Sequence, residues 1–214
     1  MNILRKPFRY TYLKATMYII LANILVFFYF NSFNVFNLNE YAFALNPAGF
    51  IFSKFLWQPL TYMFLHGGFQ HLFFNMLGLL FFGISVEKAL GTKEFLLMYF
   101  CIGILSGLFS VSLYYFSGLY YVSLIGASGA IYGILFSYAV IFPRSVIYIW
   151  GIIPVPAPVL VLVYALIEFF SQFLSSSNVA HSAHLAGFAF AFLYFVVRMG
   201  VNPIRIWKDN WKQR

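Results

Sequence analysis

Residues 94–116 read EFLLMYFCIGILSGLFSVSLYYF, a run in which Glu94 is the only charged side chain. A helix of about 20 apolar residues crosses the hydrocarbon core of a bilayer, so this stretch predicts a membrane-spanning helix. The chain as a whole is also strongly apolar, because 63% of its 214 residues are hydrophobic and only 8% are charged. A soluble domain of this size could not bury so much apolar surface. The sequence therefore predicts an all-α, multi-pass membrane protein.

The apolar pattern predicts six membrane spans in one membrane domain over residues 1–214. Between the first two spans, residues 34–68 are rich in Phe, Tyr and Trp but are interrupted by Asn, Pro and Ser. Such a segment is too polar to span and too apolar for an ordinary solvated loop, so we expect it to lie in the membrane interface. The expected spans are residues 12–33, 70–87, 94–116, 125–142, 156–175 and 182–200.

The basic residues predict the orientation. The formal net charge is +8, and all but one of the 13 Lys and Arg residues fall on the side of the membrane that carries both termini. Lys54 is the exception. This asymmetry predicts cytoplasmic N- and C-termini. The expected location is a bacterial inner membrane. Because the basic residues flank apolar spans, they indicate contact with the lipid bilayer and not with nucleic acid.

A few polar residues cluster at the starts of spans. The four histidines, His66, His71, His181 and His184, lie at or just before the second and sixth spans, and Ser128 opens the fourth. These three spans all run inward from the outer face, so their N-terminal ends share one depth. The topology therefore predicts that Ser128, His184 and the His71/Asn75 pair lie in one layer near the outer surface.

This set of residues suits a serine hydrolase. A serine hydroxyl becomes a good nucleophile when a neighbouring histidine takes its proton, and the oxyanion that forms needs hydrogen-bond donors. His71 and Asn75, spaced i, i+4, share one helical face and could supply them, together with free N–H groups where the Ser128 helix begins. Gly126 and Gly129 allow close approach of backbone or substrate, and Tyr132, one turn below Ser128, is expected to stack on His184.

The acidic residues favour a Ser–His dyad over a triad. Glu87, Glu94 and Asp209 fall on the cytoplasmic side, away from the predicted site. Glu168 lies in the fifth span toward its outer end. For this residue the sequence favours a snorkelling or structural role over catalysis, so Tyr132 is expected to hold the histidine ring where a carboxylate would otherwise do so.

At these positions the sequence resembles the rhomboid family of intramembrane serine proteases. The resemblance runs from about Trp57 to Ala191, in family order and spacing. It departs after Trp57, where the family usually has Arg and this chain has Gln58, which bears on how the first loop is anchored. The matching pieces are His66-Gly67-Gly68-Phe69-Gln70-His71-Leu72-Phe73-Phe74-Asn75, Gly83-x3-Glu87-x3-Gly91, Gly126-Ala127-Ser128-Gly129 with Tyr132, and Ala183-His184-Leu185-Ala186-Gly187.

The resemblance implies hydrolysis of peptide bonds in or beside the transmembrane segments of single-pass or polytopic substrates. It implies Ser128 as nucleophile, His184 and not His181 as base, and His71 with Asn75 as oxyanion donors. No cofactor and no metal are expected. Two rivals remain: a substrate-binding chaperone on the same fold, and a metalloprotease or metal transporter using the histidines. The second is disfavoured because the sequence has no His-Glu-x-x-His and because no carboxylate is expected beside the histidines.

Overall fold

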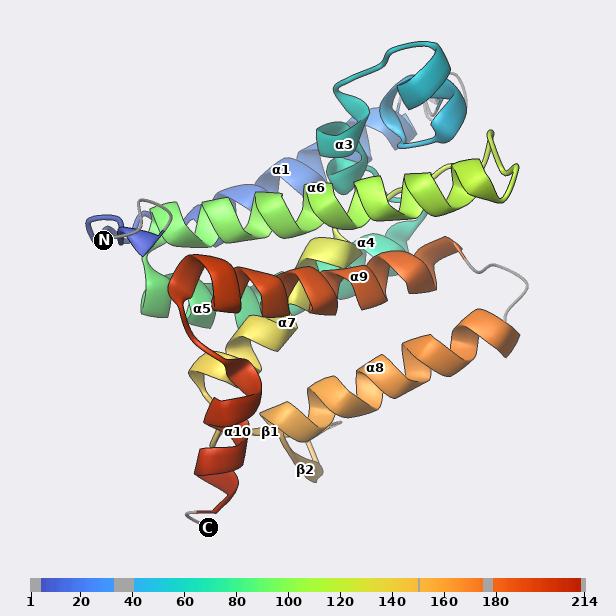
Figure 1. Cartoon of the computed structure of the whole chain (residues 1–214). Helices are drawn as coiled ribbons and strands as arrows, with labels where there is room; N and C mark the ends of the chain where they lie inside the picture. The colour runs from blue at the N-terminus through green and yellow to red at the C-terminus, as the bar shows by residue number, and fades with distance from the viewer. Residues whose placement is uncertain (1–4, 33–40, 150, 175–178, 213–214) are drawn as a thin grey trace.

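The computed structural model describes residues 5–32, 41–149, 151–174 and 179–212, and helices make up most of them (Figure 1). The second membrane helix is a composite, in which a π-helical turn at Leu79–Gly83 joins α4 to α5. Another such turn, Phe195–Met199, continues α9. The helices are α1 (Ala15–Ser32), α3 (Gln58–Thr61), α4 (Phe69–Gly78), α5 (Ile84–Leu90), α6 (Thr92–Phe116), α7 (Ser128–Ile141), α8 (Ala157–Leu174), α9 (Val179–Tyr194) and α10 (Pro203–Trp211).

Three of the described helical segments are long and apolar enough to cross a membrane, namely Phe69–Leu90, Thr92–Phe116 and His181–Met199. The other apolar helices are shorter and cover Ala15–Asn31, Ser128–Ile141 and Ala157–Phe173. Each of the six predicted spans thus falls on an apolar helix, while the count of six crossings stays a prediction. Large apolar side chains remain exposed on the outer faces of these helices, as lipid contact requires.

Two elements lie outside the six predicted spans, and one of them is a strand pair that the all-α description did not include. Residues Val146–Ile149 (β1) and Ile153–Pro156 (β2) form an antiparallel hairpin in which Val146 pairs with Pro156. Its β-branched residues favour extended backbone, and its prolines lack the N–H that a helix needs. The second element is α10, whose start is capped by Asn202 through its side-chain oxygen, which accepts from the N–H groups of Ile204 and Arg205.

The first loop is held by buried hydrogen bonds. It contains α3, a π-helical turn at Ala48–Phe52 and a 3₁₀ turn at Tyr62–Phe64, while residues 33–40 of the predicted loop lie outside the described part. Gln58 is fully buried, and its Nε2 donates to the carbonyl of Tyr41 at 2.7 Å. The uncharged amide that stands where the resembled family usually has Arg therefore does anchor the loop.

Glu87 joins the start of α1 to the turn before α6. Its carboxylate accepts from the backbone N–H groups of Ala15 and Thr16, at 2.7 and 2.9 Å, and from the Thr92 hydroxyl at 2.6 Å. A carboxylate at a helix N-terminus satisfies free N–H groups and meets the positive end of the dipole. Gly91, beside it, has φ +83°. The glycine and glutamate signature of residues 83–91 thus forms a structural joint.

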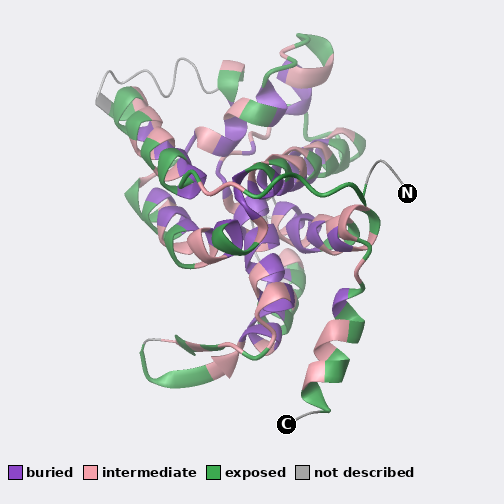
Figure 2. Cartoon of the chain, turned by 90° about the vertical axis from the view of Figure 1, so that its left-hand side faces the viewer, coloured by how far each residue is buried: buried purple, intermediate pink, exposed green. Residues whose placement is uncertain are grey.

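The helix α7 contacts α6, α8 and α9, and most of its residues are buried. Figure 2 shows that buried residues gather in the middle of the molecule. Helix α7 approaches α9 very closely, because a methyl group placed on Gly187 would lie 2.2 Å from the carbonyl oxygen of Gly129. Small residues permit such contacts between membrane helices. The interface between these two helices holds Ser128 and His184 at a fixed separation.

Candidate active site

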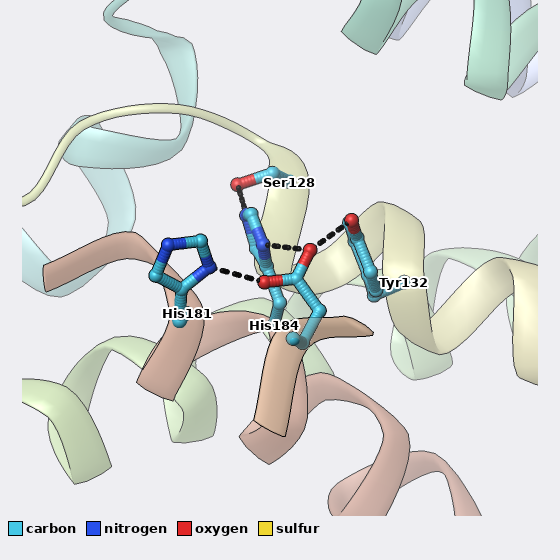
Figure 3. A network of polar contacts seen from close by, with 5 residues as sticks. Ser128, Tyr132, His181 and His184 are labelled. Atoms are coloured by element: carbon cyan, nitrogen blue, oxygen red, sulfur yellow. Dashed lines mark hydrogen bonds and ion pairs between the residues drawn. The ribbon is translucent and has the colours of Figure 1, made fainter. Parts of the chain in front are cut away.

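Ser128 and His184 are brought together by α7 and α9. The Oγ of Ser128 lies 2.7 Å from Nε2 of His184 (Figure 3). Ser128 is the first residue of α7, and the turn before it depends on Gly126, whose φ is +110° and whose N–H donates to the carbonyl of Tyr62 at 2.9 Å. An L side chain rarely adopts this φ. The glycine therefore sets where the serine emerges.

The ring of Tyr132 covers one face of His184. The two rings are 4.2 Å apart between centroids and 5° from parallel. Phe188 packs against the same tyrosine at 5.1 Å, edge to face. The stacking predicted from the one-turn spacing of Ser128 and Tyr132 is therefore present, and it limits rotation of the imidazole.

The carboxylate of Glu168 lies at the Nδ1 edge of the His184 ring, where the expected Ser–His dyad has no acid. Its Oε1 is 3.0 Å from Nδ1 of His184 and accepts a hydrogen bond from the Tyr132 hydroxyl, while its Oε2 is 2.5 Å from Nδ1 of His181. Glu168 is only 5% exposed. The available signal was a carboxylate within an apolar span, since such residues are expected to have a specific role.

His71 and Asn75 lie beside the turn that precedes Ser128. A methyl group on Gly126 would be 2.6 Å from Nε2 of His71 and 3.6 Å from Nδ2 of Asn75. Asn75 is buried, and within the described residues its Nδ2 has no hydrogen-bond partner. A buried amide donor without a partner is costly, and here it lies near the place where an oxyanion would form.

His66 packs edge to face on His71, with 5.0 Å between ring centroids. It belongs to the first loop and is 2% exposed. Burial, helped by the neighbouring His71, lowers the pKa of His66 to about 4. His66 is therefore neutral at physiological pH, and its ring packs against His71.

Three further residues flank Ser128 and His184 along α7 and α9. Gly129 and Gly187 form the close contact between α7 and α9, and His181 contacts Glu168 and not Ser128. A mainly apolar cavity of about 420 Å³ adjoins the site, with Asn75, Tyr132 and Tyr164 in its wall. An apolar side chain of a bound segment would fit there.

The expectation that no carboxylate lies beside the histidines is wrong, because Glu168 contacts both His181 and His184. These three are also the described residues best placed to hold a metal ion. Their ligand atoms all lie within 4.8 Å of one another, and two imidazoles with one carboxylate form a set that zinc accepts. In this arrangement Nδ1 of His184 would bind the ion while Nε2 still faced Ser128. The absence of a metal requirement stays a prediction.

The chain is similar to known proteins of one family. A family profile for the rhomboid domain matches residues 53–200. The chain is 33% identical over 139 residues to YdcA of Bacillus subtilis (strain 168), covering 64% of each chain. It is 30% identical over 188 residues to RHOMBOID-like protein 12, mitochondrial, of Arabidopsis thaliana, covering 81% of this chain and 55% of that one. Rhomboid protease GluP of Bacillus subtilis (strain 168) is 38% identical over 94 residues, 44% of this chain and 17% of that one.

The matched regions thus span less than two thirds of the length of these relatives. The profile match nevertheless covers most of this chain, including the residues around Ser128 and His184. This chain belongs to the rhomboid family.

Proposed function

We propose that the protein is an intramembrane serine endopeptidase that hydrolyses peptide bonds in or near transmembrane segments of membrane proteins. The observation that carries the proposal is the 2.7 Å contact between Ser128 Oγ and His184 Nε2, made where a membrane helix begins. The protein is integral to a membrane, as its family and its apolar helices indicate. The name of the similar protease GluP supports proteolysis.

The chemistry follows from the positions of the polar atoms. As Ser128 Oγ bonds to the substrate carbonyl carbon, its proton moves to Nε2 of His184. The carbonyl oxygen becomes negatively charged and accepts hydrogen bonds from Asn75 Nδ2, from His71 and from backbone N–H groups at the start of α7. His184 then gives the proton to the leaving amine. Water, activated by the same nitrogen, releases the acyl group and regenerates the serine.

The substrates proposed are single-pass or polytopic membrane proteins. A peptide bond inside a helix must leave its backbone hydrogen bonds before it reaches Ser128, so segments that unwind readily near the cut are favoured. The charge asymmetry supports cytoplasmic termini and a site near the outer face. The membrane proposed is a bacterial inner membrane.

The test compares cleavage of a reporter transmembrane substrate in liposomes by the wild type, Ser128→Ala and His184→Ala. Both variants are expected to lose cleavage. Ser137→Ala is the matched control, because Ser137 is buried in the same helix and its Oγ donates to the carbonyl of Gly133, away from the site. Cleavage by Ser128→Ala at the wild-type rate would refute the assignment.

The same fold could instead bind transmembrane clients without cutting them. Labelling by a fluorophosphonate separates the two functions, because the reagent forms a covalent bond only with an activated serine. We expect labelling of the wild type and none of Ser128→Ala. An unlabelled wild-type protein that still binds the reporter would indicate a chaperone or adaptor.

A further inference from the structure

Glu168 is placed to act on the base of the proposed reaction. The two nitrogens of His184 have different neighbours: Nε2 faces Ser128 at 2.7 Å, and Nδ1 faces Oε1 of Glu168 at 3.0 Å. To take the serine proton, Nε2 must carry no hydrogen, so the single N–H of the neutral ring must be on Nδ1. A carboxylate at Nδ1 favours that tautomer.

We propose that Glu168 is a positioning residue that completes a Ser128–His184–Glu168 triad in this protein. The inference rests on the proposed protease function. During attack, the proton passes from Ser128 Oγ to His184 Nε2, and the ring becomes an imidazolium. Glu168 keeps its negative charge, accepts from Nδ1 and stabilises the cation; it does not itself take the proton.

Burial makes the carboxylate effective. Glu168 is 5% exposed, and its two oxygens are surrounded by His184, His181 and the Tyr132 hydroxyl. With water largely excluded, the attraction between carboxylate and imidazolium is weakly screened. His181 and Tyr132 hold the carboxylate from two sides, so it reaches His184 in a restricted orientation.

The contact at Nδ1 lacks the alignment of a straight hydrogen bond, and Nδ1 has no other partner among the described residues. The ring is held by its stack on Tyr132. Catalytic hydrogen bonds are often poorly aligned without substrate and tighten in the complex.

A purely structural role for Glu168 makes a different prediction. Glu168 is on α8 and His181 on α9, and their 2.5 Å contact alone would join the two helices. That role would make the loss of Glu168 a loss of stability. The positioning role makes it a loss of turnover in protein that remains folded.

The experiment measures kcat and KM of Glu168→Gln and Glu168→Asp in liposomes, beside melting temperature and fluorophosphonate labelling. Gln keeps the size and removes the charge. We expect its kcat to fall by roughly 10²- to 10⁴-fold with little change in KM, and its labelling to slow in parallel. The kcat of Glu168→Asp, which keeps the charge, should be at least roughly ten-fold higher than that of Glu168→Gln.

Glu94→Gln is the matched control. Glu94 is also a buried carboxylate that accepts from a tyrosine, Tyr194, and it binds Arg198 at 2.7 Å, but it has no contact with Ser128 or His184. This variant is expected to be less stable than the wild type, and the kcat of its folded fraction should equal that of the wild type. Equal kcat in Glu168→Gln and Glu94→Gln would overturn the inference.

A readout on the wild type is independent of how the variants fold. Nitrogen-15 NMR of labelled histidine distinguishes the two tautomers of His184. We expect the hydrogen on Nδ1, and a hydrogen on Nε2 would overturn the inference. If Ser128→Ala still cleaves, the proposed function fails; if only Glu168→Gln behaves as wild type, the function stands and the triad fails.

Discussion

Tyr132 and His184 lie face to face, with 4.2 Å between ring centroids and 5° between ring planes. The tyrosine hydroxyl also donates to the carboxylate of Glu168. A single side chain on α7 therefore contacts both the imidazole and the group that faces its Nδ1. The ring restricts rotation of the imidazole, and the hydroxyl restricts the carboxylate.

These two contacts are expected to have separable effects. Tyr132→Phe keeps the stack and loses the hydroxyl, so its kcat should fall less than roughly ten-fold. Tyr132→Leu loses both, and misplacement of the base should lower kcat by roughly 10- to 100-fold. Tyr138→Leu is the control, because Tyr138 is an aromatic residue of the same helix that packs on Phe82. Equal kcat for Tyr132→Leu and Tyr138→Leu would contradict this account.

The close contact of α7 and α9 makes Gly187→Ala destabilising. The added methyl would lie 2.2 Å from the carbonyl oxygen of Gly129, and backbone cannot move aside as a flexible side chain does. Overpacking should cost about 3 kcal/mol, more than the roughly 1 kcal/mol that alanine gains in a helix. A melting temperature lower by roughly 5 °C is expected in detergent.

Gly68→Ala serves as the comparison for that measurement. A methyl group on Gly68 meets nothing within 4 Å, and φ there is 174°, an extended backbone open to any residue. Its melting temperature should stay near that of the wild type. If Gly187→Ala and Gly68→Ala had the same melting temperature, the contact between α7 and α9 would not be the tight one described.

The histidines lead to a prediction about metal. Because Nδ1 of His184 faces Glu168 and Nε2 faces Ser128, proteolysis is expected to proceed without a cation. Purified protein that is treated with a strong chelator and then dialysed to remove the chelator should keep its full kcat. Loss of activity that added zinc restores would instead assign Glu168, His181 and His184 as metal ligands.

His66 predicts a dependence of stability on pH. Burial lowers its pKa to about 4, so between that value and the ordinary 6.5 the unfolded chain binds more protons than the folded one. Stability contributed by neutral His66 is therefore complete above about pH 6.5 and is lost as the pH falls toward 4. His66→Phe keeps an aromatic ring and removes the titration. Between pH 7 and pH 4.5, the melting temperature of the wild type should fall further than that of His66→Phe. Equal decreases would contradict the prediction.

Much of the site could be predicted from the order of polar residues along an apolar chain. Spans that run in the same direction begin at the same depth, which placed Ser128, His184, His71 and Asn75 in one layer. The spacing of Ser128 and Tyr132, four residues apart on one helix, indicated the stack on His184. These predictions depend on depth and helical period, and a single sequence contains both.

Glu168 could not be placed in this way. Its depth was known roughly, but the direction in which it points depends on the rotation of α8 about its own axis and on how α8 packs against α9. Neither quantity is encoded in local periodicity, because α8 is apolar around most of its surface. The hairpin at residues 146–156 was missed for a related reason, since short apolar runs suit strand and helix alike.

The amino-acid sequence by itself determined that this protein is a helical membrane protein. It also predicted which polar residues begin its helices at one depth, and which of them suit the roles of nucleophile, base and donors. The tertiary structure decided which side chains touch. It placed a carboxylate at the free nitrogen of His184 and separated His181 from Ser128. Hydrophobicity fixes the depth of a residue in a bilayer, whereas the rotation and packing of whole helices decide which neighbour it meets.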